Sequence, residues 1–235
     1  MTIPMPGEVD DVGAAIDRIV GGNAYELVGA YYDPTPRNYS GMRNVLFAGR
    51  LFDELPGNDP KVFTDGDLVA ASLLDVRFGP HSVMELLQRD ECNRLLADVP
   101  DGVALWEARP EQLDRDSAAW RLWRRLVAIP GVNRTRASKL LARKRPHLMP
   151  ILDSIVVAQL QLSRGNRWET LRMAITPERR CRIEHLGHAA MHHGASHPSA
   201  LRLLDVATWM TCQLFAATNS RNRALKGSGC SHRHA

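Results

Sequence analysis

Apolar residues recur along most of the chain with the spacing of an α-helix. In residues 9–20, Val12, Ile16 and Ile19 fall on one face, and Gly21-Gly22 ends the segment. Similar patterns predict helices over 24–32, 42–55, 118–128, 134–145, 153–162 and 168–175, and further helices that begin near 177 and 198. No stretch alternates convincingly with a period of two. The pattern therefore predicts an all-α, multi-helix globular fold.

Two segments carry the signature of a helix start. Thr64 precedes an apolar run, and Asp67 lies three residues after Thr64, as in a capping box. The segment from His81 to Glu85 has the same kind of pattern. Within the predicted helix over 42–55 the polar residues are expected at the surface. They are Asn44, Arg50 and Asp53.

The stretch from Ser117 to Val157 organises the rest of the chain. Its first part has an apolar stripe of helical period, Pro130 and Gly131 stop that helix, and a second helix runs from about Arg134 to Pro146. Two helices joined by so short a connection must fold back on each other, so we expect a helical hairpin. The residues expected to be buried together in it are Trp120, Trp123, Leu126, Leu140 and Leu141.

The charge of this stretch is one-sided. Between Asp116 and Asp153 there is no acidic residue, but there are nine basic ones: Arg121, Arg124, Arg125, Arg134, Arg136, Lys139, Arg143, Lys144 and Arg145. An uncompensated cationic hairpin repels itself unless an anion lies against it, and a phosphate backbone is such an anion. The alternative is a solvated face that lines an acidic neighbour in the chain, such as the stretch 110–116.

Ile129-Pro130-Gly131-Val132, then Arg134 and Ala137-Ser138, resemble the hairpin of the helix-hairpin-helix DNA glycosylase superfamily. Pro150-Ile151-Leu152-Asp153 follows in the order and spacing of the segment that delivers the catalytic carboxylate in that superfamily. The resemblance covers this hairpin and the Asp segment only. The overall layout is also similar to an uncharacterised bacterial protein family, which adds no function.

Two positions depart from the superfamily's pattern. Asn133 stands where the hairpin usually has its second Gly, and Asn is the residue that best tolerates a left-handed conformation after Gly. Thr135 stands where bifunctional members carry the lysine that forms a Schiff base. The resemblance therefore implies a monofunctional enzyme that does not cleave the strand.

The resemblance and the charge together predict a site. Asp153 is the expected catalytic residue, although an Asp before an apolar run is also a helix N-cap by residue type. The hairpin is expected to hold a DNA phosphate at the N-terminus of its second helix. The expected DNA-binding residues are Gly131, Val132, Asn133, Arg134, Thr135, Arg136 and Lys139. The function predicted is a monofunctional DNA glycosylase. The alternatives are a non-catalytic DNA-binding clamp and a protein-interaction domain whose basic face meets an acidic partner.

The rest of the sequence indicates the domain organisation and the location of the protein. We expect one all-α domain over residues 1–218, or two helical lobes with the hairpin lobe over about 62–165, followed by a flexible basic tail over 219–235. No segment approaches the ~18–20 apolar residues of a membrane span, and the first residues lack a signal-peptide layout, so we expect a cytoplasmic protein without a membrane partner.

The cysteines and histidines predict no metal centre. The four cysteines lie far apart in the sequence, which favours reduced structural thiols in a cytosolic protein. His185, His188, His192 and His193 have helical spacings, but no Glu completes an H-E-x-x-H frame. We therefore expect no metal and no cofactor.

Overall fold

The computed structural model describes residues 4–35, 37–39, 42–163 and 165–213. Its helices and strands are α1 (Pro6–Val20), α2 (Ala24–Tyr32), β1 (Arg37–Tyr39), β2 (Met42–Val45), α3 (Asp65–Ser72), α4 (Pro80–Gln88), α5 (Glu91–Ala97), α6 (Ala118–Val127), α7 (Arg134–Lys144), α8 (Ser154–Gln159), α9 (Arg167–Ala174) and α10 (Pro177–His192). Residues 200–213 form a further helix, and short 3₁₀ helices span Ala48–Leu51, Leu105–Glu107 and Pro110–Gln112. The predicted all-α fold is confirmed. The predicted tail over 219–235 lies outside the described residues.

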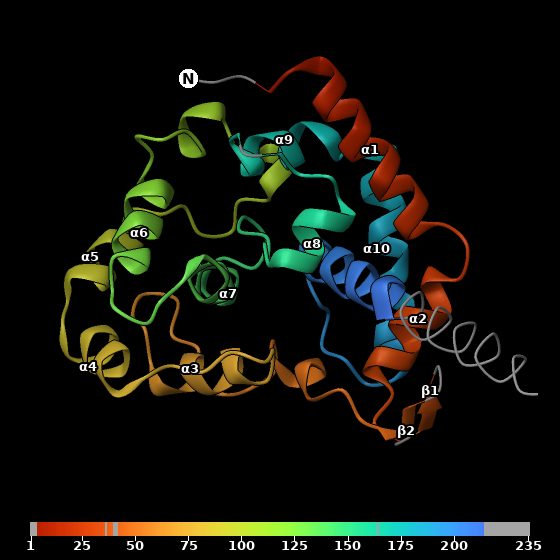
Figure 1. Ribbon diagram of the computed structural model, residues 1–235, viewed down its shortest axis with the longest axis horizontal. Coiled ribbons are helices and arrows are strands. Elements are labelled where there is room, and N and C mark those ends of the chain that lie inside the picture. The colour runs from red at the N-terminus through yellow and green to blue at the C-terminus, as the bar shows by residue number, and fades with distance from the viewer. Residues whose placement is uncertain (1–3, 36, 40–41, 164, 214–235) are drawn as a thin grey trace, which may run out of the picture.

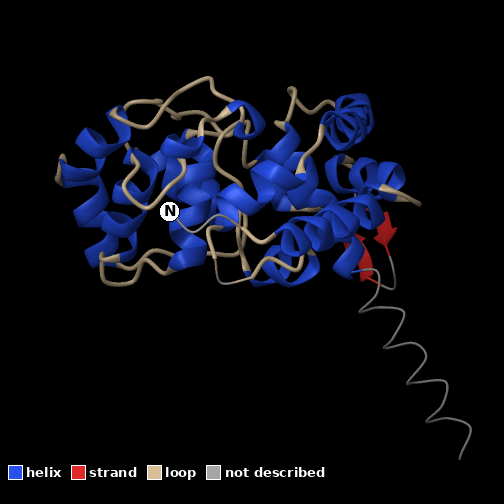
Figure 2. Cartoon of the chain, turned by 90° about the horizontal axis from the view of Figure 1, so that it is seen from above, coloured by secondary structure: helices blue, strands red, loops and turns tan. Residues whose placement is uncertain are grey.

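The helices gather in two groups around a central one. Figure 1 shows α3 to α6 around α7, which is seen nearly along its axis, and α1, α2, α10 and the helix over 200–213 on the other side, with α8 between. Figure 2 shows the two strands at one end of the otherwise helical chain. They pair antiparallel, with Arg37 opposite Val45 and Tyr39 opposite Met42. No helix in the described residues is long and apolar enough to cross a bilayer.

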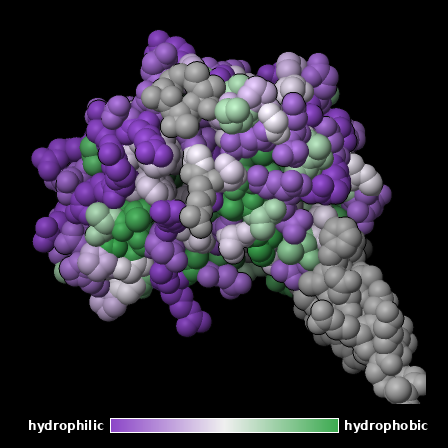
Figure 3. Space-filling view, turned by 45° about the horizontal axis from the view of Figure 1, so that its top comes forward, coloured by the Kyte–Doolittle hydropathy of each residue, from purple (hydrophilic) through white to green (hydrophobic). Residues whose placement is uncertain are grey.

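The core is a contiguous cluster of buried apolar side chains that extends through both groups. It runs from Val12 in α1, through Leu122, Leu126 and Leu140 in α6 and α7, to Met210 in the last helix. On the face seen in Figure 3, hydrophobic residues appear in small patches between hydrophilic ones. Trp120 and Trp123 are only partly buried, unlike Leu126, Leu140 and Leu141, so the expectation that all five lie together in the core was wrong for the two tryptophans.

One of the two predicted helix starts has the expected cap. The Thr64 hydroxyl accepts from the Asp67 N–H, and the Asp67 carboxylate accepts from the Thr64 N–H, so the capping box is present. The second helix, α4, begins earlier than expected, with Gly79 as its N-cap, and no side chain caps it. Ser82 instead donates to the Pro130 carbonyl at 3.1 Å and so ties α4 to the turn after α6.

The predicted helix over 42–55 was wrong. The segment holds β2 and a short 3₁₀ helix instead. Three of its carbonyl groups accept hydrogen bonds from distant cations: Gly49 accepts from Arg202 at 2.8 Å, and Phe52 and Leu55 accept from Arg143. Because these acceptors are engaged by side chains from other parts of the chain, tertiary contacts override the local apolar spacing.

Candidate nucleic-acid interface and active-site cavity

The turn between α6 and α7 has the geometry that its residues predict at Gly131 but not at Asn133. Gly131 has φ +86°, which favours glycine. Asn133 has φ −82° rather than the expected left-handed conformation, and it is the N-cap of α7. Its side-chain oxygen accepts from the Arg136 N–H at 2.9 Å. Asn therefore stands here because it caps the helix.

Several backbone N–H groups at the start of α7 remain available to a ligand. The Val132 N–H donates to the Ile129 carbonyl at 2.9 Å, so it is not one of them. In the part of the chain that the structure describes, the N–H groups of Asn133, Arg134 and Thr135 find no acceptor. Asn133 and Arg134 are exposed and Thr135 is half-buried. Free N–H groups at the positive end of a helix dipole favour an anion at this position.

The acid-free stretch of sequence is not acid-free in space. Arg125 forms ion pairs with Glu85 and Glu91, and Arg121 lies 3.6 Å from Asp98. These acids belong to α4, α5 and the segment after it, not to the stretch 110–116, which contacts the hairpin through carbonyl groups. These two of the nine cations are therefore paired with acids that are remote in sequence.

Three consecutive cations at the end of α7 are buried. Lys144 and Arg143 form ion pairs with Asp67 in α3. Arg145 donates to the carbonyls of Leu96 and Val99 at 2.9 and 3.0 Å, at the end of α5, where a helix C-terminus favours positive charge. Burial lowers the pKa of all three. These side chains hold α7 to its neighbours and are not available to DNA.

The surface cations of the hairpin are fewer than the sequence suggests. Arg121, Arg124 and Arg134 are exposed, and Arg136 is half-buried. Lys139 was expected to contact a DNA phosphate. It is only 6% exposed and donates to the Leu74 carbonyl, so it cannot contact a phosphate on the outer surface. Val132 is also buried, at 3% exposure. The positive surface at the hairpin therefore rests on these four arginines.

Asp153 lines a cavity of about 390 Å³ between the two groups of helices. Thr135 and Lys139, one turn apart on α7, line the same cavity, as does Asp205 from the helix over 200–213. Phe47 and Trp209 contribute aromatic rings, with centroids 5.6 Å apart. This volume is within the ~300–1,000 Å³ of ligand pockets. The chain thus brings Asp153 to the hairpin, as the sequence predicted.

Asp153 is a helix N-cap, and it also has one carboxylate oxygen that the cap does not use. Its Oδ1 accepts from the N–H groups of Ile155 and Val156 at 3.0 and 2.9 Å, so Asp153 is the N-cap of α8. No hydrogen bond from the described residues reaches Oδ2. The Leu152 N–H donates to the Ser138 hydroxyl at 3.2 Å, which fixes the segment before Asp153 against α7. Capping therefore uses one oxygen and does not occupy the other.

Sequence reasoning missed a buried cation that organises the far wall of the cavity. Arg202 is 4% exposed and donates to Asp53 at 3.2 Å, to the Tyr31 hydroxyl at 2.8 Å and to Asp205. Asp53, expected at the surface, is therefore part of an internal network. Burial raises the pKa of Asp205 to about 6, while the charge of Arg202 opposes the shift.

Lys139 carries a perturbed amine into the same cavity. Burial lowers its pKa, and the negative charges of Asp153 and Asp205 oppose that shift. The cavity thus holds two carboxylates and an amine. The sequence indicated Asp153 as a catalytic residue and Lys139 as a DNA-binding residue, but it gave no signal that Asp205 joins them, because Asp205 comes from a helix far along the chain.

The histidine-rich segment lies mainly on α10. His185 and His188 have ring centroids 5.2 Å apart, and His193 Nδ1 lies 4.0 Å from Asp33. Across the described ranges, no three His, Cys, Asp or Glu residues form a group that could hold a metal ion. None of these four histidines lines the cavity at Asp153.

A family model matches residues 24–212, which include α2 to α10 and all the residues that line the cavity at Asp153. No curated protein and no solved structure matches the chain. The match covers well over half of the sequence, so the chain belongs to DUF6308, a family of unknown function.

Proposed function

We propose that the protein binds DNA and hydrolyses the N-glycosidic bond of a modified base without cutting the strand. The observation that carries the proposal is the shared cavity of Asp153 and Thr135, the two positions that the glycosylase resemblance assigns to the active site. The cavity opens beside the N-terminus of α7, where free N–H groups favour a phosphate. Its aromatic wall supports the entry of a base that has left the helical stack.

The residues of the cavity suggest a division of labour. A strand phosphate lies at the N–H groups of Arg134 and Thr135, and the extruded base enters the cavity and packs against the aromatic wall of Phe47 and Trp209. The Asp153 carboxylate stabilises positive charge on the sugar as the bond from C1′ to the base nitrogen breaks. Water then supplies a hydroxyl group to C1′ and a proton to the departing base. The Lys139 ammonium reduces the repulsion between Asp153 and Asp205.

The binding half of the proposal is tested by the salt dependence of affinity for duplex DNA, measured by fluorescence anisotropy. Four surface arginines at the hairpin set a limiting log–log slope of about −3.6, at ~0.9 per neutralised phosphate. The double substitution Arg134→Ala/Arg136→Ala should flatten it by about 1.8. Arg180→Ala on α10 is the control and should leave the slope unchanged. Affinity that does not depend on salt would refute binding at the hairpin.

The catalytic half is tested at Asp153, since Asn caps a helix about as well as Asp. Asp153→Asn should melt close to the wild type, bind DNA normally, and release no base from a panel of damaged duplexes on which the wild type is active. Asp153→Ala should also lose about 1 kcal/mol of stability, the contribution of one cap. A wild type inactive on every lesion, with the Asn variant indistinguishable from it, would favour the non-catalytic clamp.

The absence of strand cleavage is tested by borohydride trapping. Thr135 cannot form a Schiff base, so the wild type should leave abasic sites uncut and give no covalent adduct. Lys139 is the amine that could contradict this, because it lies one turn further along α7 in the same cavity. An adduct that disappears in Lys139→Ala would show that the enzyme is bifunctional and that Lys139 is its nucleophile.

A further inference from the structure

A second cavity lies against the neighbouring face of α7. Its volume is about 650 Å³, and it is lined by Trp120 and Trp123 of α6, Trp168 of α9 and several arginines. Arg134 and Ser138 face this cavity, whereas their neighbours Thr135 and Lys139 face the cavity at Asp153. The helix therefore separates two distinct sites.

The three indoles form a fixed aromatic wall. The ring centroids of Trp120 and Trp123 are 5.0 Å apart with planes at 74°, and those of Trp120 and Trp168 are 4.8 Å apart with planes at 48°. The indole N–H of Trp120 donates to the Leu113 carbonyl at 2.8 Å, which holds the ring in place. Trp168 is 5% exposed and supports the other two, which are half-buried at the cavity. The rings of Trp120 and Trp123 therefore offer stacking surface to the cavity.

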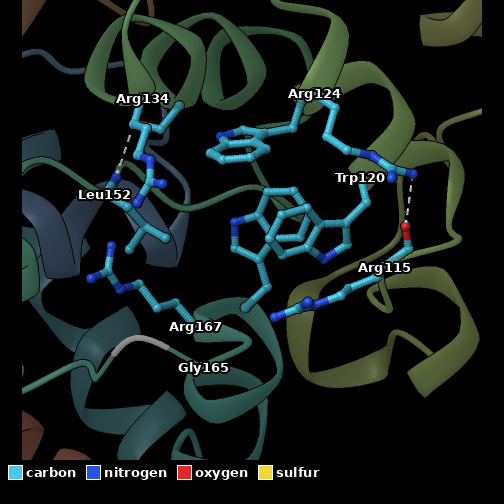
Figure 4. A pocket seen from close by; sticks show the side chains of 10 residues that line it. Arg115, Trp120, Arg124, Arg134, Leu152, Gly165 and Arg167 are labelled. Carbon is cyan, nitrogen blue, oxygen red and sulfur yellow. Dashed lines mark hydrogen bonds between the residues drawn. The ribbon is translucent and has the colours of Figure 1, made fainter. Parts of the chain in front are cut away.

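The polar part of the cavity wall is cationic. Figure 4 shows Arg134 and Arg167 extending toward Leu152 from opposite walls, with Arg115 and Arg124 on the far side of the indoles. The guanidinium carbon of Arg134 lies 5.9 Å from the Trp123 ring centroid, and Arg124 donates to the Arg115 carbonyl at 3.0 Å. None of the described residues that line this cavity is acidic. An occupant must therefore bring negative charge together with a flat apolar surface.

We infer that this cavity binds a nucleotide: an unstacked nucleobase packs against the indoles, and its phosphate pairs with Arg115, Arg124 and Arg134. Base–indole stacking tolerates any base, and arginine forms two parallel hydrogen bonds to a phosphate. An acidic peptide would satisfy the arginines but would leave the three indoles without a planar partner. The nucleotide is either free or part of a single strand. The site stands without the glycosylase activity, because none of its residues belongs to the chemistry assigned to Asp153.

The first experiment follows the tryptophan fluorescence of the full chain. Deoxyadenosine monophosphate and short single-stranded oligo(dA) should both quench it saturably, deoxyadenosine more weakly, and inorganic phosphate not at all. Much tighter binding of oligo(dA) than of the mononucleotide would identify a strand as the natural occupant, and equal affinities would identify a free nucleotide. Both results support the inference. Absence of quenching by either, or displacement of the nucleotide by polyglutamate at equal concentration, would overturn it.

Variants test whether the cavity is the site. Arg115→Gln and Trp123→Leu should each weaken binding of the mononucleotide at least tenfold, measured by calorimetry. The matched controls are Arg180→Gln and Trp106→Leu, which alter a similar cation–indole pair at 5.6 Å outside the cavity and should change nothing. Circular dichroism must show that all four variants fold. Unchanged affinity in the folded cavity variants would refute the inference.

The inference and the proposed function fail separately. Asp153→Asn should bind the mononucleotide as the wild type does. Loss of base release with intact nucleotide binding would leave this second site standing, and the reverse result would leave the glycosylase proposal standing.

Discussion

Asp67 is buried between two cations, so the stability of the fold depends strongly on its charge. Its side chain is fully buried, as is that of Lys144, and the two form an ion pair, with Arg143 Nε 3.7 Å from Oδ1. The same carboxylate accepts from the Thr64 N–H at 2.7 Å and so starts α3. Asp67→Asn keeps an acceptor for that N–H but removes the charge. It therefore isolates the ion pair from the capping box.

The expected loss of stability comes from the buried Lys144 charge that Asp67→Asn leaves without its partner. Breaking a buried ion pair costs about 3–5 kcal/mol, because an uncompensated charge remains in the interior. Lys144 keeps two neutral acceptors, the Asn58 side chain at 3.1 Å and the Asp59 carbonyl at 2.8 Å. Burial already lowers its pKa, so it can also release its proton. These two routes place the expected loss at the lower end, about 3 kcal/mol.

The assay is urea unfolding at pH 7, followed by circular dichroism. Asp67→Asn should lower the free energy of unfolding by about 3 kcal/mol, whereas Asp67→Asn/Lys144→Met should recover most of that loss, because it removes both charges. Arg121→Ala is the surface control: its partner Asp98 lies 3.6 Å away with both side chains about half exposed, so the loss should be below about 0.5 kcal/mol. A loss below about 1 kcal/mol in the single variant, or additive losses in the double, would refute the reasoning.

Two further predictions concern Asp205 and Gly131. Burial raises the pKa of Asp205 from 3.8 to about 6, so the folded chain keeps a proton that the unfolded chain has released. This contribution is fully present below about pH 4 and is lost by about pH 6, so unfolding titrations should show the wild type losing roughly 3 kcal/mol relative to Asp205→Asn across that window; a flat difference would refute the shift. Gly131→Ala should lower stability by about 1–2 kcal/mol from its positive φ, and by more than Gly102→Ala, because its Cβ would lie 2.8 Å from the Ser82 hydroxyl. Equal melting temperatures in the two glycine variants would contradict the second expectation.

Local patterns predicted the helices best where local chemistry decides them. The break between α6 and α7 was readable because Pro130 and Gly131 act on the backbone directly, and the start of α3 was readable because Thr64 and Asp67 cap it within one turn. The segment over 42–55 failed for the opposite reason. Its carbonyl groups accept hydrogen bonds from Arg143 and Arg202, and nothing in the neighbouring sequence indicates these partners.

The residues of the candidate site also fall into two groups: those that a local pattern indicated and those that only the fold brings together. Asp153 and Thr135 were predicted because a motif fixes their spacing in one stretch of sequence. Lys139 was expected at a phosphate and lies in the cavity instead, since helical periodicity alone does not say which face of α7 is covered. Asp205 and Arg202 come from a helix far along the chain. Only the folded chain brings them to Asp153, so no pattern within a window could reveal them.

The packing of α1 means that the folding unit is larger than the segment by which the family is recognised. The match begins at residue 24, after α1 has ended, yet Val12, Ala15 and Ile16 of that helix are fully buried. Asp17 pairs with Arg179 at 2.9 Å and with Arg182 at 2.7 Å, both on α10. A fragment trimmed to the family boundaries would expose an apolar trough along α9 and α10 and leave both arginines without their carboxylate. Expression of any homologue for biochemistry should therefore start upstream of the matched residues.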